Sequence, residues 1–199
     1  MRTTPRSDLS YEIIRSRRVT ADIVVERDGL NATKVLREYR NGEGFFYLGR
    51  SHRLTLASDQ DEPLLLKGGR FVLRHDLVDR GEVARAKAAF RDYFIARGKE
   101  RMTERVHYYA PKVGVKPRHI AVRDLGHRWA SCSPKGDVAF HWKCMMAPPT
   151  IIDYIVVHEL CHFHRLNHTE AFWNEVDKVM PNYRERKNWL KHNGASMDL

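Results

Sequence analysis

The chain has 199 residues, 42% of them hydrophobic and 30% charged, a composition typical of a globular protein rather than a disordered or fibrous one. No apolar run approaches the ~20 residues that a membrane-spanning helix needs, and the first residues lack the apolar middle of a signal peptide, so we expect a cytoplasmic protein that does not enter a membrane. The formal net charge of +10 is shared by both halves of the chain, and it permits a nucleic-acid or acidic partner without any motif that requires one.

The first third of the chain predicts β-strands. Its segments are short, apolar or β-branched, and separated by Asp-Gly, Asn-Gly and Gly-Gly turns. The predicted strands are 11–15, 20–26, 44–49, 53–57, 63–67 and 70–74, with one short helix over 32–39. No group of side chains suited to chemistry occurs here. We therefore predict an N-terminal antiparallel β-rich region, residues 1–79, that supports or flanks a site in residues 80–199.

From residue 82 the periodicity becomes helical. Apolar residues recur at intervals of three and four or their multiples as far as Ala110, and Pro111 is expected to end the helix, with a possible bend at Gly98. The outer face of this helix is rich in Lys and Arg. If nucleic acid binds at all, a basic groove along this helix is the first place to expect it.

Two segments after the long helix alternate as strands, 119–123 and 137–142, and they suggest a hairpin-like unit. Between them lie residues 128–133 and a turn at Pro134-Lys135-Gly136. A final helix is predicted from Pro181 to about His192, closed by Gly194.

The most informative stretch is Val157-His158-Glu159-Leu160-Cys161-His162, at the end of an apolar run that Pro148 and Pro149 introduce. The prolines and the apolar run predict a helix that begins near 149 and runs to about Leu166. Residues four apart share one helix face, so His158 and His162 can direct ring nitrogens at one zinc ion. Glu159, one residue on, should reach a water on the metal rather than the metal itself.

A catalytic zinc ion needs a third protein ligand and one open position, and His168 is the best candidate. Its distance from His162 is that of the long motif H-E-x-x-H-x-x-G-x-x-H, although Arg165 stands in place of the glycine. We therefore expect His168 to reach back from just past the end of the helix. Thr169 is placed to cap the next helix, which should begin near Glu170.

Several neighbours are candidates for contacts with a substrate or with the metal ligands: Arg128, Ser131, Cys132, His141 and Tyr154. Arg128 could hold a substrate group or pair with a carboxylate. Cys132 could be a fourth zinc ligand or a packed thiol. His141 or Tyr154 could polarise the scissile carbonyl. The strand 137–142 is the more plausible of the two to receive a substrate chain by edge pairing.

The three cysteines, Cys132, Cys144 and Cys161, form no C-x-x-C pair, and their odd number argues against a disulfide framework. Reduced thiols agree with a cytoplasmic protein.

In order and spacing, several segments resemble the YgjP-like metallopeptidase family, whose consensus motifs are R-W-G-S-C, A-P-x-x-x-x-D-Y-V-V-x-H-E-L-x-H and N-H-x-x-x-F-W. The matching segments are 128–132, 140–142, 147–149, 152–162, 167–168 and 172–173. Ala130 replaces a glycine of these motifs, and His141 stands where asparagine is usual. The chain also looks like the wider zincin-type proteases that include SprT/Spartan-like DNA-dependent enzymes.

The resemblance implies an α+β fold, a minimal zincin-like metallopeptidase domain, in which one zinc ion is held by His158, His162 and His168 and Glu159 is the catalytic base. The expected reaction is hydrolysis of a peptide bond in a peptide or protein substrate. Two alternatives use the same site: a zinc-dependent nucleotide phosphohydrolase and a DNA-coupled protease. A third is a binding module with structural zinc, which normally has four protein ligands. The sequence does not indicate an oligomeric state.

Overall fold

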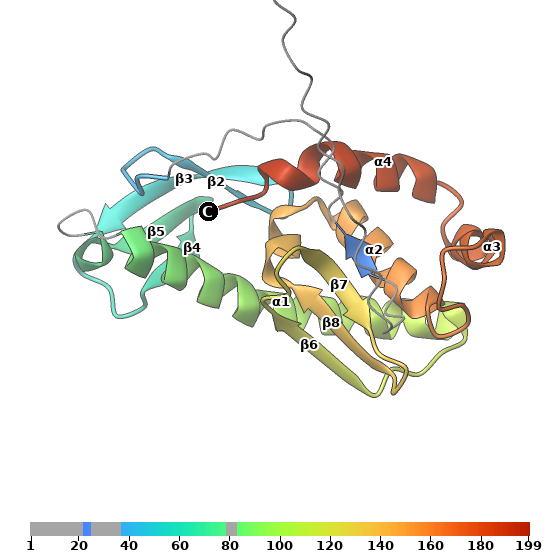
Figure 1. The fold of residues 1–199 in the computed structure, drawn as a ribbon. Helices are drawn as coiled ribbons and strands as arrows, with labels where there is room; N and C mark the ends of the chain where they lie inside the picture. The colour runs from blue at the N-terminus through green and yellow to red at the C-terminus, as the bar shows by residue number, and fades with distance from the viewer. Residues whose placement is uncertain (1–21, 25–36, 79–82) are drawn as a thin grey trace, which may run out of the picture.

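The computed structural model describes residues 22–24, 37–78 and 83–199 (Figure 1). The predicted strand 11–15, most of the predicted helix 32–39 and the predicted boundary after residue 79 lie outside the described residues. Of the predicted strand 20–26, the described part is β1 (Asp22–Val24). Residues 37–40 are described and are not helical.

The N-terminal sheet is mixed rather than antiparallel. Its strands are β2 (Gly44–Tyr47), β3 (Arg50–Ala57), β4 (Leu64–Lys67) and β5 (Arg70–Arg74), in the order β2-β3-β5-β4. The turn at Gly68 and Gly69 pairs β4 antiparallel with β5 and places β5, not β4, beside β3. Because β5 then runs in the direction of β3, this one pair is parallel, contrary to the predicted arrangement.

The turn between β2 and β3 attaches this sheet to the rest of the protein. Leu48 and Gly49 have positive φ values of 49° and 78°. Their N–H groups donate to the carbonyls of Met145, at 2.8 Å, and Met146, at 3.1 Å. These acceptors belong to the 3₁₀ helix η3 (Trp142–Met146), so the turn is held against the segment that leads into helix α2 (Pro149–Cys161).

We expect Gly49→Ala to destabilise the protein by about 2–4 kcal/mol. A Cβ there would lie 2.8 Å from Pro148 Cα, and the positive φ adds a cost of about 1–2 kcal/mol for any L side chain. The matched control is Gly68→Ala, because Gly68 also has a positive φ but a Cβ there meets nothing within 4 Å. Urea unfolding of both variants measures the difference. Equal losses of stability would contradict the proposed close approach of the turn to Pro148.

The long helix α1 (Val83–Val113) spans both parts of the molecule (Figure 1). Phe90 and Phe94 pack in the core beneath the N-terminal sheet. Gly98 lies where a Cβ would come within 3.1 Å of Val122 Cγ1, so the glycine allows the helix to approach the second sheet closely. The helix continues three residues beyond its predicted end at Ala110. Pro111 lies in its last turn, and helical hydrogen bonding continues past it, with the Gly114 N–H donating to the Ala110 carbonyl at 2.9 Å.

The second sheet has the order β1-β7-β8-β6. Its strands are β1, β6 (His119–Arg123), β7 (Arg128–Cys132) and β8 (Asp137–His141). The predicted hairpin of 119–123 with 137–142 is wrong, because β7 lies between them in sequence, pairs antiparallel with β8, and leaves β6 parallel to β8. β8 is bonded on both sides, so it cannot receive a substrate by edge pairing. The predicted choice of this strand is therefore also wrong.

The C-terminal part of the chain is helical. The helices are α2 (Pro149–Cys161), α3 (Glu170–Val179) and α4 (Tyr183–Asn193), followed by the 3₁₀ turn η4 (Gly194–Ser196); a further 3₁₀ turn, η1 (His75–Leu77), follows β5. α2 is almost entirely buried and contacts α1, α3, α4 and β7. Arg105 on α1 binds Asp153 on α2 through two hydrogen bonds of 2.6 and 3.0 Å. Within the part of the chain described, no helix combines the length and apolar character needed to cross a bilayer.

α2 ends at Cys161, five residues before its predicted end at Leu166. The N–H groups of His162, Phe163 and His164 each bond to the carbonyl three residues earlier, which tightens the chain into a turn. The imidazole Nε2–H of His164 donates to the Val113 carbonyl at the end of α1, at 2.8 Å. The early end matters for the site, because it turns the chain back so that His168 faces α2.

Candidate metal centre

Three imidazole nitrogens converge at the C-terminal end of α2. His158 Nε2 lies 3.1 Å from His162 Nε2 and 2.8 Å from His168 Nε2. Nitrogen lone pairs at such distances repel unless a proton or a cation lies between them. Two tetrahedral ligands at the usual Zn–N distance of ~2.0–2.1 Å are roughly 3.3 Å apart. The donor atoms therefore fit a small divalent cation after only a slight expansion.

Local structure explains why the three rings meet. His158 and His162 are four residues apart on α2, and both are buried. The Nδ1–H of His162 donates to the Arg165 carbonyl at 3.0 Å, which leaves its Nε2 lone pair directed at the other two rings. His168 approaches from the loop between α2 and α3. Thr169 follows at the N-cap position of α3 as predicted, but its side chain makes no capping hydrogen bond.

Aromatic side chains hold the rings in place. Phe172 stacks on His162 with ring centroids 4.5 Å apart, and Trp173 stacks on His168 at 5.6 Å. Tyr154, one turn earlier on α2, lies edge-on to His158 at 5.9 Å. In the sequence, Phe172 and Trp173 appear only as a segment of the family resemblance, with no role at the site. The sequence signal for their contact with the histidines is that the pair follows His168 by four and five residues, within the first turn of the next helix.

The environment keeps His158 and His162 neutral. Burial lowers the pKa of His158 well below its usual value, and the neighbouring rings of His162 and His168 lower it further. Burial also lowers the pKa of His162 to about 4. Neutral imidazoles offer lone pairs, which is the protonation state that metal binding requires.

Glu159 is fully buried beside this centre. Burial is the main cause that raises the pKa of Cys132 to about 12, and the negative charge of Glu159 raises it further. The same charge adds to the effect of burial on the pKa of Tyr154. The carboxylate therefore lies between α2 and the end of β7, close to both side chains.

The other predicted site residues lie in different parts of the structure. Tyr154 lies beside the centre, and Cys132 is close enough to Glu159 to feel its charge. The donor atoms that converge are those of the three histidines and do not include the Cys132 thiol. Arg128 and Ser131 lie on β7, opposite β1. The His141 ring is buried at the end of β8, where its Nδ1 accepts the Lys143 N–H at 3.0 Å and its Nε2 lies 3.5 Å from Asp124. The bond from Lys143 caps η3.

A centre of three histidines, two at the end of a helix and one on the following loop, beside a small sheet in an α+β fold, is an arrangement that metallopeptidases use. The family model of the YgjP-like metallopeptidase domain matches residues 16–193. The chain therefore belongs to the YgjP-like metallopeptidase family, and it is a hydrolase of the metallopeptidase class.

Other comparisons add less. The metallopeptidase zymogen of Pyrococcus abyssi abylysin is similar to this chain with 23% sequence identity and a TM-score of 0.42, over 48% of this chain and 92% of that one. Among curated proteins, no match to this chain is found.

Proposed function

We propose that this protein is a zinc-dependent peptidase in which His158, His162 and His168 hold one zinc ion and Glu159 is the general base. The observation that carries the proposal is the convergence of three Nε2 atoms, all within 4.8 Å of one another, next to a buried carboxylate. Three neutral imidazoles and one open position are the usual donor set of a catalytic zinc ion. Other transition metals bind such a site too, so metal analysis is part of the test.

The residues of the chain divide the reaction between them. When bound, the zinc ion would lower the pKa of a water molecule and polarise the peptide carbonyl. Glu159 would accept a proton from the attacking water molecule as the oxygen of that water bonds to the carbonyl carbon. Glu159 would then pass the proton to the departing nitrogen as the C–N bond breaks. The products are a carboxylic acid and an amine, and transfer of the acid's proton to the amine gives a carboxylate and an ammonium. The rings of Phe172, Trp173 and Tyr154 keep the three imidazoles oriented throughout.

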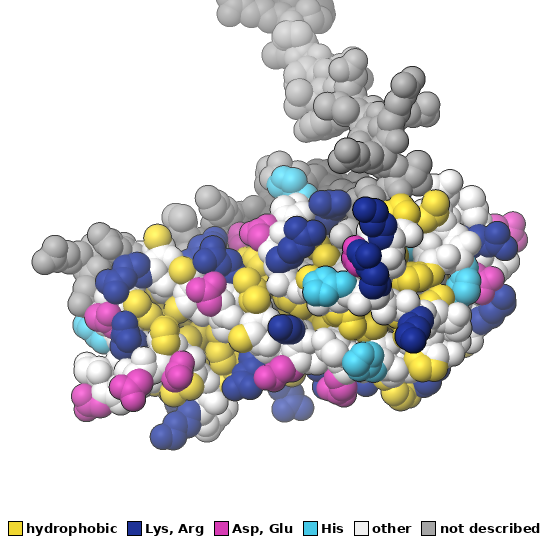
Figure 2. All heavy atoms as spheres, turned by 90° about the horizontal axis from the view of Figure 1, so that it is seen from below, with side chains coloured by type: hydrophobic (Ala, Val, Ile, Leu, Met, Phe, Trp, Pro, Cys, Tyr) yellow, Lys and Arg dark blue, Asp and Glu magenta, His cyan; other side chains and the backbone are white. Residues whose placement is uncertain are grey.

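The long helix offers no support for the basic groove that the sequence suggested. Arg91, Arg97 and Arg101 on α1 each lie within ion-pair distance of an acidic residue one or three positions further on. Figure 2 shows Lys and Arg side chains distributed over the face seen from below, with acidic side chains among them. We therefore propose a peptide or protein substrate rather than a nucleotide. The activity assay described below also includes DNA.

We also propose that the protein acts in the cytoplasm. Cys132, Cys144 and Cys161 are all buried free thiols, which suits a reducing compartment.

Removing the metal should abolish peptide hydrolysis. We expect the purified protein to contain about one zinc ion per chain by elemental analysis and to cleave members of a broad peptide pool. A chelator should lower the rate by at least about 100-fold, and one equivalent of zinc should restore it, because the three imidazoles alone supply no activated water.

The same assay is run with single-stranded DNA and with nucleotides. Activity that survives complete removal of metal would contradict the proposal. So would phosphate release from nucleotides without cleavage of any peptide. Stimulation by DNA would leave the chemistry intact and assign the protease to a DNA-coupled role.

A further inference from the structure

A hollow of about 330 Å³ lies beside the three-histidine centre. It is lined by Trp173 from α3 and, at the start of α4 and along it, by Tyr183, Arg184, Lys187 and Asn188. Its volume lies at the lower end of the range for small-ligand pockets, roughly 300–1,000 Å³. It could therefore hold one side chain or one chain end of a peptide.

Trp173 connects this hollow to the centre. Its ring stacks on His168 and lies 5.7 Å from the ring of His158. The same indole stacks on Tyr183 at 5.2 Å, and the Lys187 ammonium lies 4.1 Å from its centroid. The positive charge of Lys187 also contributes to the lowered pKa of His158, after burial and the other two rings. A group in the hollow would thus be one aromatic ring away from the three histidines.

Within the described part of the chain, no carboxylate neutralises the two cations of the hollow. Among the residues that the structure describes, neither Arg184 nor Lys187 has a carboxylate within ion-pair distance, and the contacts they make are with the rings of Tyr183 and Trp173. In contrast, Lys178 on α3 lies 3.0 Å from Glu175. Arg184 and Lys187 are exposed cations that lie over aromatic rings, and the Asn188 amide is beside them. Such a group of side chains is well suited to bind a carboxylate.

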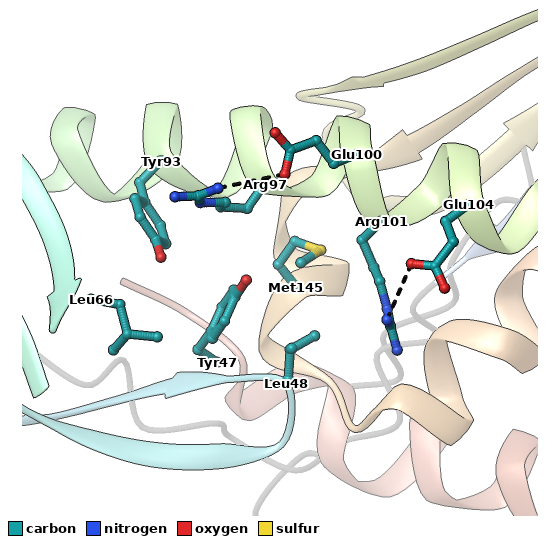
Figure 3. Close-up of a pocket in the computed structure, with 9 residues that line it drawn as sticks. All are labelled: Tyr47, Leu48, Leu66, Tyr93, Arg97, Glu100, Arg101, Glu104 and Met145. Atoms are coloured by element: carbon teal, nitrogen blue, oxygen red, sulfur yellow. Dashed lines mark hydrogen bonds and ion pairs between the residues drawn. The ribbon is translucent and has the colours of Figure 1, made fainter. Parts of the chain in front are cut away.

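A larger hollow lacks this property. It measures about 380 Å³ and lies between α1 and the N-terminal sheet (Figure 3). Its two arginines, Arg97 and Arg101, are each paired with a glutamate of the same hollow, as the dashed lines in Figure 3 show. Since its charges are already compensated, it gives no comparable indication of a ligand.

We propose that the hollow formed by Trp173, Tyr183, Arg184, Lys187 and Asn188 is a substrate subsite that binds a carboxylate of the peptide near the scissile bond. The carboxylate is either the side chain of an Asp or Glu residue or the C-terminus of the peptide. Arg184 and Lys187 are then specificity-determining residues. This inference rests on the proposed peptidase activity and adds a preference for acidic substrates.

The test uses three matched fluorogenic peptides with the full-length, zinc-loaded protein. One is neutral and C-terminally amidated, one is amidated and carries Glu close to the cleavage position, and one is neutral with a free C-terminus. We expect kcat/KM for at least one of the two carboxylate-bearing peptides to exceed that of the neutral peptide about tenfold at low salt. The advantage should shrink as salt screens the charges.

Lys187→Gln and Arg184→Gln should remove most of this advantage, because kcat/KM should fall more for the carboxylate-bearing peptides than for the neutral one. The charge-reversal variant Lys187→Glu should shift the preference towards a peptide with Lys at the same place. The matched control is Lys178→Gln, which removes one positive charge from α3 outside the hollow and should leave the preference unchanged. All of these side chains are exposed, so the variants should fold.

Binding is measured separately from turnover, by fluorescence anisotropy of labelled peptides with Glu159→Gln. Tighter binding of the carboxylate-bearing peptides, lost with Lys187→Gln, supports the subsite. Equal binding and equal cleavage of all three peptides overturns it while leaving the peptidase proposal intact. Lys187-dependent binding of an oligonucleotide, without preference among the peptides, also overturns it and indicates a phosphate site. Carboxylate-dependent binding without cleavage of any peptide supports the subsite but counts against the peptidase.

Discussion

Replacing Glu159 with glutamine should leave the metal in place and lower kcat for peptide hydrolysis by about 10²–10⁴, the usual contribution of a general base. Glutamine has nearly the shape of glutamate and fits the same buried position between α2 and β7, but it cannot accept the proton. The metal content should be that of the wild type, because the three imidazoles provide the donor atoms. Elemental analysis and steady-state kinetics on one cleaved peptide measure both quantities.

Glu175→Gln is the control for this result. Glu175 also carries a carboxylate, but it pairs with Lys178 on α3 and lies outside the group of converging histidines. We expect this variant to keep wild-type kinetics. If Glu159→Gln cleaves peptides as fast as the wild type, Glu159 is not the base. If instead it loses both the metal and the activity, the carboxylate supports the centre rather than the proton transfer.

The His162→Ala variant should lose the metal itself. We expect its affinity for zinc to fall by more than about 100-fold, beyond the 10–100-fold typical of losing a hydrogen bond that merely supports a ligand. Hydrolysis should fall with metal occupancy. Competition with a zinc-binding dye measures the affinity, and the assay at saturating zinc separates lost binding from lost chemistry.

A histidine outside the centre provides the comparison. His107 is exposed on α1 and does not belong to the group of converging rings. His107→Ala should bind zinc as the wild type does. An unchanged zinc affinity for His162→Ala, with circular dichroism showing a folded protein, would exclude His162 as a ligand.

Much of the centre could be predicted because its information is local. The four-residue spacing of His158 and His162, after a proline-initiated apolar run, is sufficient to place two rings on one helix face. His168 could be added to this pair because only a short loop separates it from the end of the helix. The structure places all three rings together as the sequence suggests, and the family match confirms the metallopeptidase class.

The wrong predictions concern segments whose structure is set by contacts with residues distant in sequence. The segment 128–132 has little apolar alternation, since its buried positions include Trp129 and Ala130 in succession, so it was not recognised as a strand. Because β7 was not predicted, β6 and β8 were expected to form a hairpin, and β8 was expected to be an edge strand of the sheet. The end of α2 is likewise set by a tertiary contact, the hydrogen bond of His164 to Val113.

The hollow beside the three histidines could not be predicted either, because its lining residues come from two different helices. Trp173 is on α3, whereas Lys187 is on α4, and a helical pattern alone does not show that their side chains meet. The sequence offered a basic final helix, and only the packing of that helix on α3 shows which of its cations lie near the centre.

Diffraction from zinc-containing crystals at the zinc absorption edge would locate the metal ion itself. We expect one anomalous peak per chain, ~2.0–2.1 Å from the Nε2 atoms of His158, His162 and His168. A peak elsewhere in the molecule, or a His168 ring turned away with no other side chain in its place, would contradict the proposed zinc centre.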